Sequence, residues 1–202
     1  MIKKILPLLM ATITPAACAY PTISEILNPP SVDVTVDMEK AVSIEVIPDK
    51  SWKCEDCTDN EKYVLEQLQE KTRISDRNAL ATIMGNIKSE SNFHPNICEG
   101  GARIPYRDCT RGGYGLIQWT SLGRYNNLGK FARKYGYDPS SLEGQTAYMI
   151  NESVFQRYLP EFEGPGKTVD QYMVAAYYWL GWGIKGYRQQ YAYDYTKKLV
   201  WS

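Results

Sequence analysis

The stretch from Ser75 to Pro95 reads SDRNALATIMGNIKSESNFHP, and it predicts the helix around which the fold is built. Ser75 or Asp76 can act as the N-cap, because a short polar side chain there accepts a hydrogen bond from a free backbone N–H of the first turn. Four apolar residues then follow at the i, i+3, i+4, i+7 spacing of one helical face: Leu80, Ile83, Met84 and Ile87. Since Pro95 cannot continue a helix, we expect the helix to end just before it.

Glu90 falls in the last turns of this helix. At about 100° per residue it lies roughly 60 to 70° from the centre of the apolar face, on the margin between core and solvent. The negative end of the helix dipole and the desolvation beside Phe93 both disfavour a second negative charge there. A half-buried carboxyl group that stays neutral is what general acid catalysis near neutral pH requires. We therefore expect Glu90 to be a proton donor; the alternative is an ordinary boundary glutamate.

A second motif follows about twenty residues later, where residues 112–120 read GGYGLIQWT. Glycines allow the backbone to approach a ligand closely, and Gly115 lies in the middle of the motif. The amide of Gln118 can donate and accept hydrogen bonds, as sugar hydroxyl and N-acetyl groups require. Tyr114 and Trp119 offer flat apolar faces with a polar handle. The motif predicts a carbohydrate-binding segment, although a glycine-rich hairpin with a core Trp119 is the alternative.

These two motifs together resemble those of the phage tail lysozyme family, within the lysozyme-like superfamily, which is related to goose-type lysozymes and soluble lytic transglycosylases. The resemblance rests on Glu90-Ser91-x-Phe93-x-Pro95 and on residues 113–120, with Arg124 shortly after, and it covers about residues 60–200. It implies that Glu90 is the catalytic acid. It also implies that Gln118 and the backbone of residues 113–116 line a sugar-binding cleft, with Arg124 among the substrate-binding residues and peptidoglycan glycan strands as the substrate.

The remaining pattern predicts a mainly α (α+β) fold, a lysozyme-like helical domain with a small β-hairpin or loop lobe between Asn96 and Thr120. Apolar residues recur at helical spacing in five further segments. These run from Thr58 or Asp59 to Lys71, across Tyr125–Ala132, from the Asp138-Pro139 pair to Glu152, from Thr168 to Trp179, and across Tyr187–Leu199.

The first 57 residues differ from the rest. Residues 1–19 are predicted to be an export signal, with a basic start, a short apolar stretch and Ala17-Cys18-Ala19 as cleavage site; a lipoprotein signal at Cys18 is the alternative. Within residues 20–57 the runs 32–37 and 42–46 alternate apolar and polar positions, and they predict an extended or β-hairpin arm ahead of the catalytic domain at 58–202. The arm through residues 20–50 would tether the domain or contact a virion or cell-envelope partner. We expect an exported protein, periplasmic, secreted or virion-associated.

Composition excludes some partners. The formal net charge is zero, and loss of residues 1–19 removes two lysines and no acidic residue, so the mature chain carries about −2. The chain lacks the clustered basic field that nucleic-acid binding requires, so we expect no nucleic-acid partner. The apolar part of the signal is about half the ~20 residues of a bilayer span, so we expect no stable membrane span after its removal. No cofactor is implied.

Four cysteines remain beside Cys18, an even number that fits an oxidising compartment. Of the three pairings we favour Cys98 with Cys109, which would close the loop between the two motifs; Cys54 and Cys57 then pair locally or stay reduced. A zinc site with four thiolates is the competing interpretation, and without it we expect no metal. A cysteine peptidase built on Cys98 and His94, the only histidine, is disfavoured because Cys98 is expected to be oxidised.

The reaction is predicted to be lysozyme-type hydrolysis of the MurNAc–GlcNAc β-1,4 bond. Glycosidases commonly use two carboxyl groups, and Glu99 and Asp108 on the disulfide-bounded loop are the candidates for the second. If neither faces the cleft, the resemblance to transglycosylases implies assistance by the N-acetyl group of the substrate and a 1,6-anhydro product. A non-catalytic wall-binding or virion structural module is the alternative outside enzymology.

Overall fold

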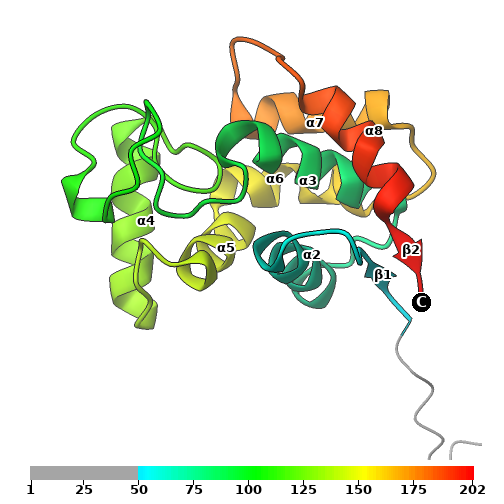
Figure 1. Cartoon of the computed structure of the whole chain (residues 1–202), viewed down its shortest axis with the longest axis horizontal. Coiled ribbons are helices and arrows are strands. Elements are labelled where there is room, and N and C mark those ends of the chain that lie inside the picture. The colour runs from blue at the N-terminus through cyan, green and yellow to red at the C-terminus, as the bar shows by residue number, and fades with distance from the viewer. Residues whose placement is uncertain (1–49) are drawn as a thin grey trace, which may run out of the picture. The chain divides into compact units, whose positions relative to one another are not determined.

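The computed structural model describes residues 50–202, so the predicted signal and most of the predicted arm lie outside the described residues. Its elements are β1 (Trp52–Lys53), α2 (Asp59–Lys71), α3 (Arg77–Ser91), the 3₁₀ helix η1 (Tyr106–Asp108), α4 (Leu122–Tyr135), α5 (Leu142–Asn151), α6 (Ser153–Glu163), α7 (Val169–Leu180), α8 (Arg188–Lys198) and β2 (Val200–Trp201). The mainly helical class is thus confirmed (Figure 1). Among these helices none has the length and apolarity that a bilayer crossing needs.

Helix starts follow the predicted caps. Thr58 accepts a hydrogen bond from Glu61 N while the Glu61 side chain accepts from Thr58 N, which is a capping box at the start of α2. Asp76 accepts from the backbone of Asn78 and Ala79 at the start of α3. Thr168 forms a second capping box with Gln171 at the start of α7. In each case side chains satisfy backbone N–H groups that lack partners within the helix.

The segment after Asp138 departs from the prediction. The helix α5 begins later than expected, at Leu142, with Ser141 as its N-cap, and it ends at Asn151. Glu152 has an extended backbone (φ −66°, ψ 132°) and separates α5 from α6, which the sequence pattern did not predict. The carboxylate of Glu152 is held by Arg124 of α4, a distant contact that fixes the break.

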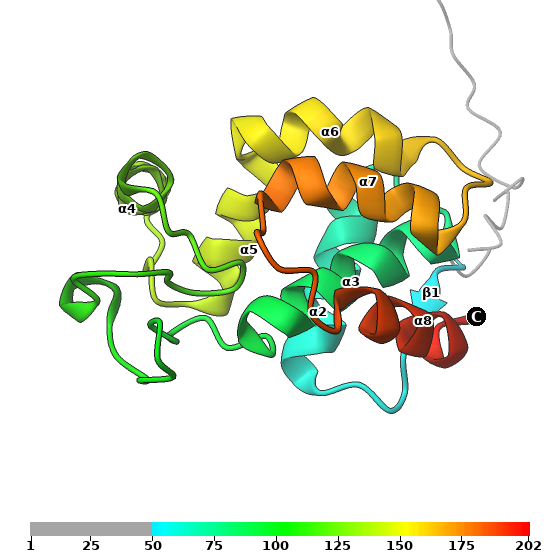
Figure 2. The same ribbon diagram turned by 90° about the horizontal axis from the view of Figure 1, so that it is seen from above.

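The helix α3 is the centre of the domain. Nine consecutive residues from Ala79 to Ile87 are buried, and α2, α6, α7 and α8 all contact it (Figures 1 and 2). Gly85 allows the closest of these contacts, since a Cβ atom there would lie 2.4 Å from the backbone nitrogen of Ala192 in α8. The helices α4 and α5, with the loop between α3 and α4, make up the other lobe (Figure 2).

The small sheet does not lie in the loop lobe. It pairs β1 with β2 antiparallel, with Trp52 opposite Trp201 and Lys53 opposite Val200. Residues 52–57, which the sequence assigned to the arm, therefore pack with the end of the helical domain. In the loop between α3 and α4, where a small β-hairpin or loop lobe was expected, the loop form is found. Among the described residues it has only isolated bridges between Ile97 and Arg103 and between Cys98 and Tyr114.

A buried carboxylate links α2, α3 and α8. Glu61 is 4 % exposed; it accepts hydrogen bonds from Thr58 N (2.7 Å), from Lys88 Nζ (3.1 Å) and from the hydroxyl of Tyr195. Burial would raise the pKa of Glu61, but the hydrogen bonds from Tyr195, Thr58 and Lys88 outweigh it and lower the pKa from 4.5 to about 2.

This lowered pKa predicts a loss of stability in acid. Because the folded pKa of Glu61 is below the unfolded one, its contribution is fully present above about pH 4.5 and is lost as pH falls towards 2. We expect the Glu61→Gln variant to lack about 3 kcal/mol of the parent's unfolding free energy at neutral pH and to approach the parent at pH 2. Urea unfolding of both proteins at several pH values measures this. A difference that stays constant from pH 7 to pH 2 would contradict it.

Candidate active site

Glu90 lies in the last turn of α3, and its side chain is 13 % exposed. Its Oε1 accepts a hydrogen bond from Arg188 Nη2 of α8 at 2.6 Å. The predicted half-buried position is therefore found, but the carboxyl group has a cationic partner that the sequence did not indicate.

The next residue joins Glu90 to the second motif. Ser91 is buried, and its hydroxyl donates to the carbonyl of Leu116 at 2.8 Å. The helix ends directly afterwards, because Asn92 and Phe93 both adopt left-handed backbone conformations (φ 49° and 61°) that turn the chain away. The hydroxyl of Ser91 thus holds the end of α3 beside the glycine-rich segment.

A cleft of about 850 Å³ opens between this segment and the loop that joins α7 to α8. One wall consists of residues 117, 118, 120 and 121 with Arg124, and the other of residues 180–184 and 186. Glu90 and Arg188 also line it. In Figure 1 the second wall is the loop that arches at the top, between α7 and α8. Among residues 50–202, Glu90 is the one acidic side chain that lines this cleft.

The glycine-rich segment is held by a buried amide that the sequence did not single out. Gln145 of α5 is fully buried; it accepts from Leu116 N (2.8 Å) and donates to the carbonyls of Pro95 (2.6 Å) and Pro139 (2.8 Å). Gly115 has φ +75°, and a Cβ atom there would lie 2.2 Å from Gln145 Oε1. Gly115 is buried too, so close packing against Gln145, and not contact with a sugar, requires this glycine.

Tyr114 and Trp119 do not line the cleft. Both side chains are fully buried. The hydroxyl of Tyr114 donates to the carbonyl of Ile104 at 3.1 Å, and Trp119 packs against Tyr148 with ring centroids 5.3 Å apart. The expected sugar-facing role of these two rings is thus replaced by a core role, because the whole stretch 113–117 and Trp119 are buried against the rest of the lobe. Trp119 matches the alternative interpretation of the motif.

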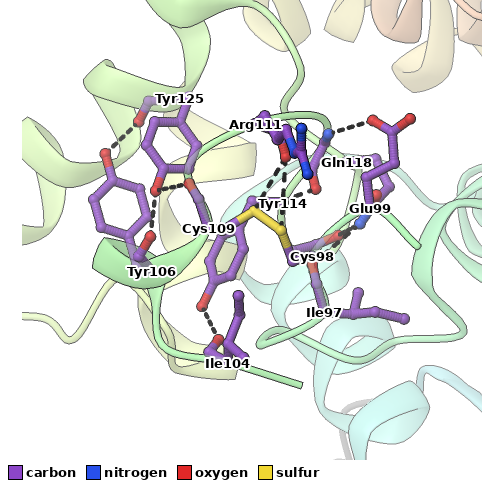
Figure 3. The surroundings of a disulfide bond; sticks show 12 residues. Ile97, Cys98, Glu99, Ile104, Tyr106, Cys109, Arg111, Tyr114, Gln118 and Tyr125 are labelled. Atoms are coloured by element: carbon purple, nitrogen blue, oxygen red, sulfur yellow. Dashed lines mark hydrogen bonds between the residues drawn. A yellow bond between two sulfur atoms is a disulfide. The ribbon is translucent and has the colours of Figure 1, made fainter. Parts of the chain in front are cut away.

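Gln118 does line the cleft, and it also braces the segment that carries it. Its backbone is left-handed (φ 49°), and its Nε2 donates to the carbonyls of Gly115 (3.0 Å) and Ile97 (3.3 Å). Figure 3 shows Gln118 beside Glu99 and the disulfide. With its amide nitrogen engaged by the protein, the amide oxygen is the group it offers to a ligand.

Arg124 lines the cleft as predicted, but its charge is already matched. Its Nε and Nη2 donate to the two oxygens of Glu152 at 2.6 and 2.7 Å, and its side chain is 22 % exposed while that of Glu152 is 3 % exposed. A bidentate pair of this kind fixes the guanidinium plane. Arg124 therefore presents a rigid edge to the cleft.

Neutralising Glu152, the partner of Arg124, should destabilise this part of the cleft wall. We expect Glu152→Gln to lower the free energy of unfolding by about 2 kcal/mol, less than for a fully buried pair because Arg124 can reach water. The double variant Arg124→Gln/Glu152→Gln should recover part of the loss, because it leaves no unpaired charge. Denaturant unfolding of the parent, both single variants and the double variant gives the coupling. Strict additivity of the two single effects would contradict an interacting pair.

The two candidates for a second catalytic carboxylate lie elsewhere. Glu99 is exposed, and its Oε2 accepts from Gly113 N at 2.8 Å, so it braces the loop. Asp108 is exposed and pairs with its neighbour Arg107 at 3.4 Å. Neither lines the cleft. The structure thus brings together Glu90, Gln118 and Arg124 of the predicted set, and it leaves Glu99 and Asp108 outside.

The favoured disulfide between Cys98 and Cys109 forms, and Cys54 pairs with Cys57, which is one of the two outcomes left open for them. The first ties the beginning of the loop lobe to its 3₁₀ helix, beside Tyr114 (Figure 3). By restricting the unfolded chain it contributes about 3 kcal/mol. The pairing leaves no thiolate on these four cysteines, which removes the four-thiolate zinc site and the Cys98 peptidase; the described residues also hold no other cluster of potential metal ligands.

Four residues of the site were not among the predicted site residues. Arg188 and Trp182 line the cleft, whereas Gln145 and Glu152 hold its parts from behind. A weak signal existed for two of them. Trp182 follows Gly181 in a loop after a helix, and loops often carry binding residues. Gln145 is a polar residue among the apolar residues of a helix face. For Arg188 and Glu152 the sequence pattern offers no signal, since each acts through a partner far along the chain.

Comparison with known proteins agrees with this geometry. A family model described as Phage tail lysozyme matches residues 59–199, which is the described domain except for its ends. Searches of curated proteins and of solved structures returned no match. The matched range contains Glu90, the glycine-rich segment, both walls of the cleft and Arg188. The chain therefore belongs to the phage tail lysozyme family, within the lysozyme-like superfamily.

Proposed function

We propose that this protein cleaves the MurNAc–GlcNAc β-1,4 bond of peptidoglycan glycan strands, with Glu90 as the general acid. Membership of the phage tail lysozyme family supports a lysozyme-like action on peptidoglycan. The observation that carries the finer proposal is the place of Glu90, a carboxyl group 13 % exposed in a cleft of about 850 Å³. The shape of the site supports this, because an open cleft between two lobes can admit a long polymer.

In the proposed step the glycosidic oxygen lies beside Glu90. Its proton passes to that oxygen as the bond from the oxygen to C1 breaks and the bonding electrons go to the leaving sugar. The other sugar becomes oxocarbenium-like at C1, and a nucleophile must then reach C1. If the nucleophile is water, the product is a reducing sugar.

Lytic transglycosylation is a second candidate, favoured by one observation. Glu99 and Asp108 both lie outside the cleft, so stabilisation of C1 falls to the N-acetyl group of the substrate. Its carbonyl oxygen would bond to C1, and the C6 hydroxyl of the same sugar would then displace it, giving its proton to the Glu90 carboxylate. The product would be a 1,6-anhydro sugar, with no water consumed.

Mass spectrometry of digested peptidoglycan distinguishes hydrolysis from lytic transglycosylation. Purified sacculi are incubated with the protein, and the soluble fragments are analysed for their glycan ends. New reducing ends indicate hydrolysis, and ends lighter by one water indicate the anhydro product. Binding to sacculi without any new glycan end would contradict the proposal and would favour a non-catalytic wall-binding module.

We also propose that the protein acts outside the cytoplasm. The two disulfides fit an oxidising compartment, and they agree with the export signal predicted at residues 1–19. The predicted contact of residues 20–50 with a virion or envelope partner stays a prediction on the part of the chain that the structure does not describe.

A further inference from the structure

Arg188 of α8 contacts Glu90 in the cleft. We propose that Arg188 is a positioning residue that holds one oxygen of Glu90 and stabilises the carboxylate which Glu90 becomes when it gives up its proton. This inference rests on the proposed function, since it presupposes that Glu90 is the acid.

The guanidinium is fixed by the loop that forms one wall of the cleft. Arg188 is 8 % exposed; its Nη1 donates to the carbonyls of Ile184 (2.7 Å) and Lys185 (3.0 Å), and its Nη2 donates to Glu90 (2.6 Å). The ring of Trp182 lies over it, with its centroid 5.4 Å from the guanidinium carbon. A planar guanidinium with several donors can reach these three acceptors at once, whereas the single ammonium group of a lysine cannot.

One feature of Arg188 is costly for stability alone. Its Nε is buried and has no hydrogen-bond partner within residues 50–202. A buried donor without a partner costs about 1–3 kcal/mol, and such groups are rare in native proteins. The orientation that leaves Nε unpaired is the one that aims Nη2 at Glu90, which points to a role in the site.

The pair leaves the other oxygen of Glu90 available. Oε1 is occupied by Arg188, whereas no hydrogen bond from the described residues reaches Oε2. Both residues line the cleft. In the acid form Oε1 can remain the acceptor for Arg188 while Oε2 carries the proton. The donated proton thus has a defined place, on the oxygen that the protein does not use.

Two opposite effects on the rate follow. Charge grows on Glu90 as its proton leaves, so the attraction to Arg188 is stronger in the transition state than in the ground state and lowers the barrier. The same attraction favours loss of the proton to solvent before substrate binds, which depletes the active acid form as pH rises. Arg188 should therefore speed the reaction in acid and confine it to lower pH.

Other charged groups around Glu90 are few. The segment from Gly112 to Ser121 has no charged residue. From α4 Arg124 faces the cleft with its charge matched by Glu152, and on the α7–α8 loop the ammonium of Lys185 donates to Gln189. On α3 itself, Lys88 pairs with Glu61. Arg188 is thus the charged group that contacts Glu90 directly.

The test compares pH–rate profiles. Initial rates of sacculus digestion are measured across pH for the parent, Arg188→Met, Arg188→Gln and Arg188→Lys, with Arg133→Met, an exposed arginine of α4, as the control. Circular dichroism establishes folding at each pH. We expect both neutral variants to lose about 10- to 100-fold in rate on the acid side. We also expect their rate to fall at a higher pH on the alkaline side than that of the parent. Arg188→Lys keeps the charge, so its alkaline fall should stay near that of the parent.

The shape of the profile decides the outcome. A neutral variant that folds only in part still reports the pH of the alkaline fall, once the rate at each pH is divided by the folded fraction that circular dichroism gives there. A uniform drop with an unchanged profile would mean that Arg188 is merely structural, and a fall moved to lower pH would also overturn the inference. Failure of the proposed function is recognised by a different result, because the Glu90→Gln variant would then digest sacculi as fast as the parent.

Discussion

The Glu90→Gln variant is expected to cleave peptidoglycan about 10²- to 10⁴-fold more slowly than the parent while still binding sacculi. An amide has the shape of the carboxyl group but no acidic proton, so the leaving sugar would have to depart as an alkoxide. The side-chain oxygen can still accept the hydrogen bond that Arg188 gives to Oε1. The fold should therefore survive, although Arg188 loses its counter-charge.

Two matched controls separate the loss of the acid from a general effect of removing charge. Glu99→Gln and Asp108→Asn each neutralise an exposed carboxylate outside the cleft, and they should keep activity close to that of the parent. Release of soluble fragments from dye-labelled sacculi gives the rates, and co-sedimentation with sacculi gives the binding. A Glu99→Gln or Asp108→Asn variant as impaired as Glu90→Gln would point to a two-carboxylate mechanism instead.

The Gln145→Leu variant is expected to lose about 3–6 kcal/mol of unfolding free energy, or to fail to fold. The side chain of Gln145 bonds three backbone groups, Leu116 N and the carbonyls of Pro95 and Pro139. Leucine fills a similar volume but leaves all three groups buried without a partner, at about 1–3 kcal/mol each. Because these groups belong to the segments on both sides of the loop lobe, the glycine-rich wall of the cleft should lose its shape and activity should fall with stability.

Gln190→Leu is the control for this substitution. Gln190 is exposed on α8, where its amide bonds Asp194, so its loss should change stability by less than about 0.5 kcal/mol. Chemical denaturation of both variants measures the difference. A Gln145→Leu protein as stable as the parent would show that the three backbone groups find other partners, and it would contradict the role assigned to Gln145.

The sequence was informative where structure depends on neighbouring residues. Caps were readable to within one residue, as Thr58 or Asp59, Ser75 or Asp76, and Thr168, because a capping side chain bonds a backbone group two or three residues away. The position of Glu90 on the edge of its helix followed from helical periodicity alone. The disulfide between Cys98 and Cys109 was favoured because it closes a short loop between two motifs.

It was uninformative where structure depends on distant residues. The partner of Glu90 is 98 positions away on α8, and the break at Glu152 depends on Arg124, 28 positions earlier. The roles of Tyr114 and Trp119 were misassigned because an aromatic ring suits a core and a sugar-binding surface equally well, and only the packing decides between them. The site is thus fixed by long-range ion pairs and one buried amide that no local pattern reveals.

The most direct test of the account is a crystal structure of the Glu90→Gln variant with a peptidoglycan tetrasaccharide. The central claim is that the bond to be cleaved lies beside the side chain at position 90, within the cleft between the glycine-rich segment and the α7–α8 loop. We expect a glycosidic oxygen within about 3 Å of that side chain, with sugars on both sides contacting Gln118 and Trp182. A glycan bound on another face, or one whose glycosidic oxygens all lie beyond reach of position 90, would contradict the claim.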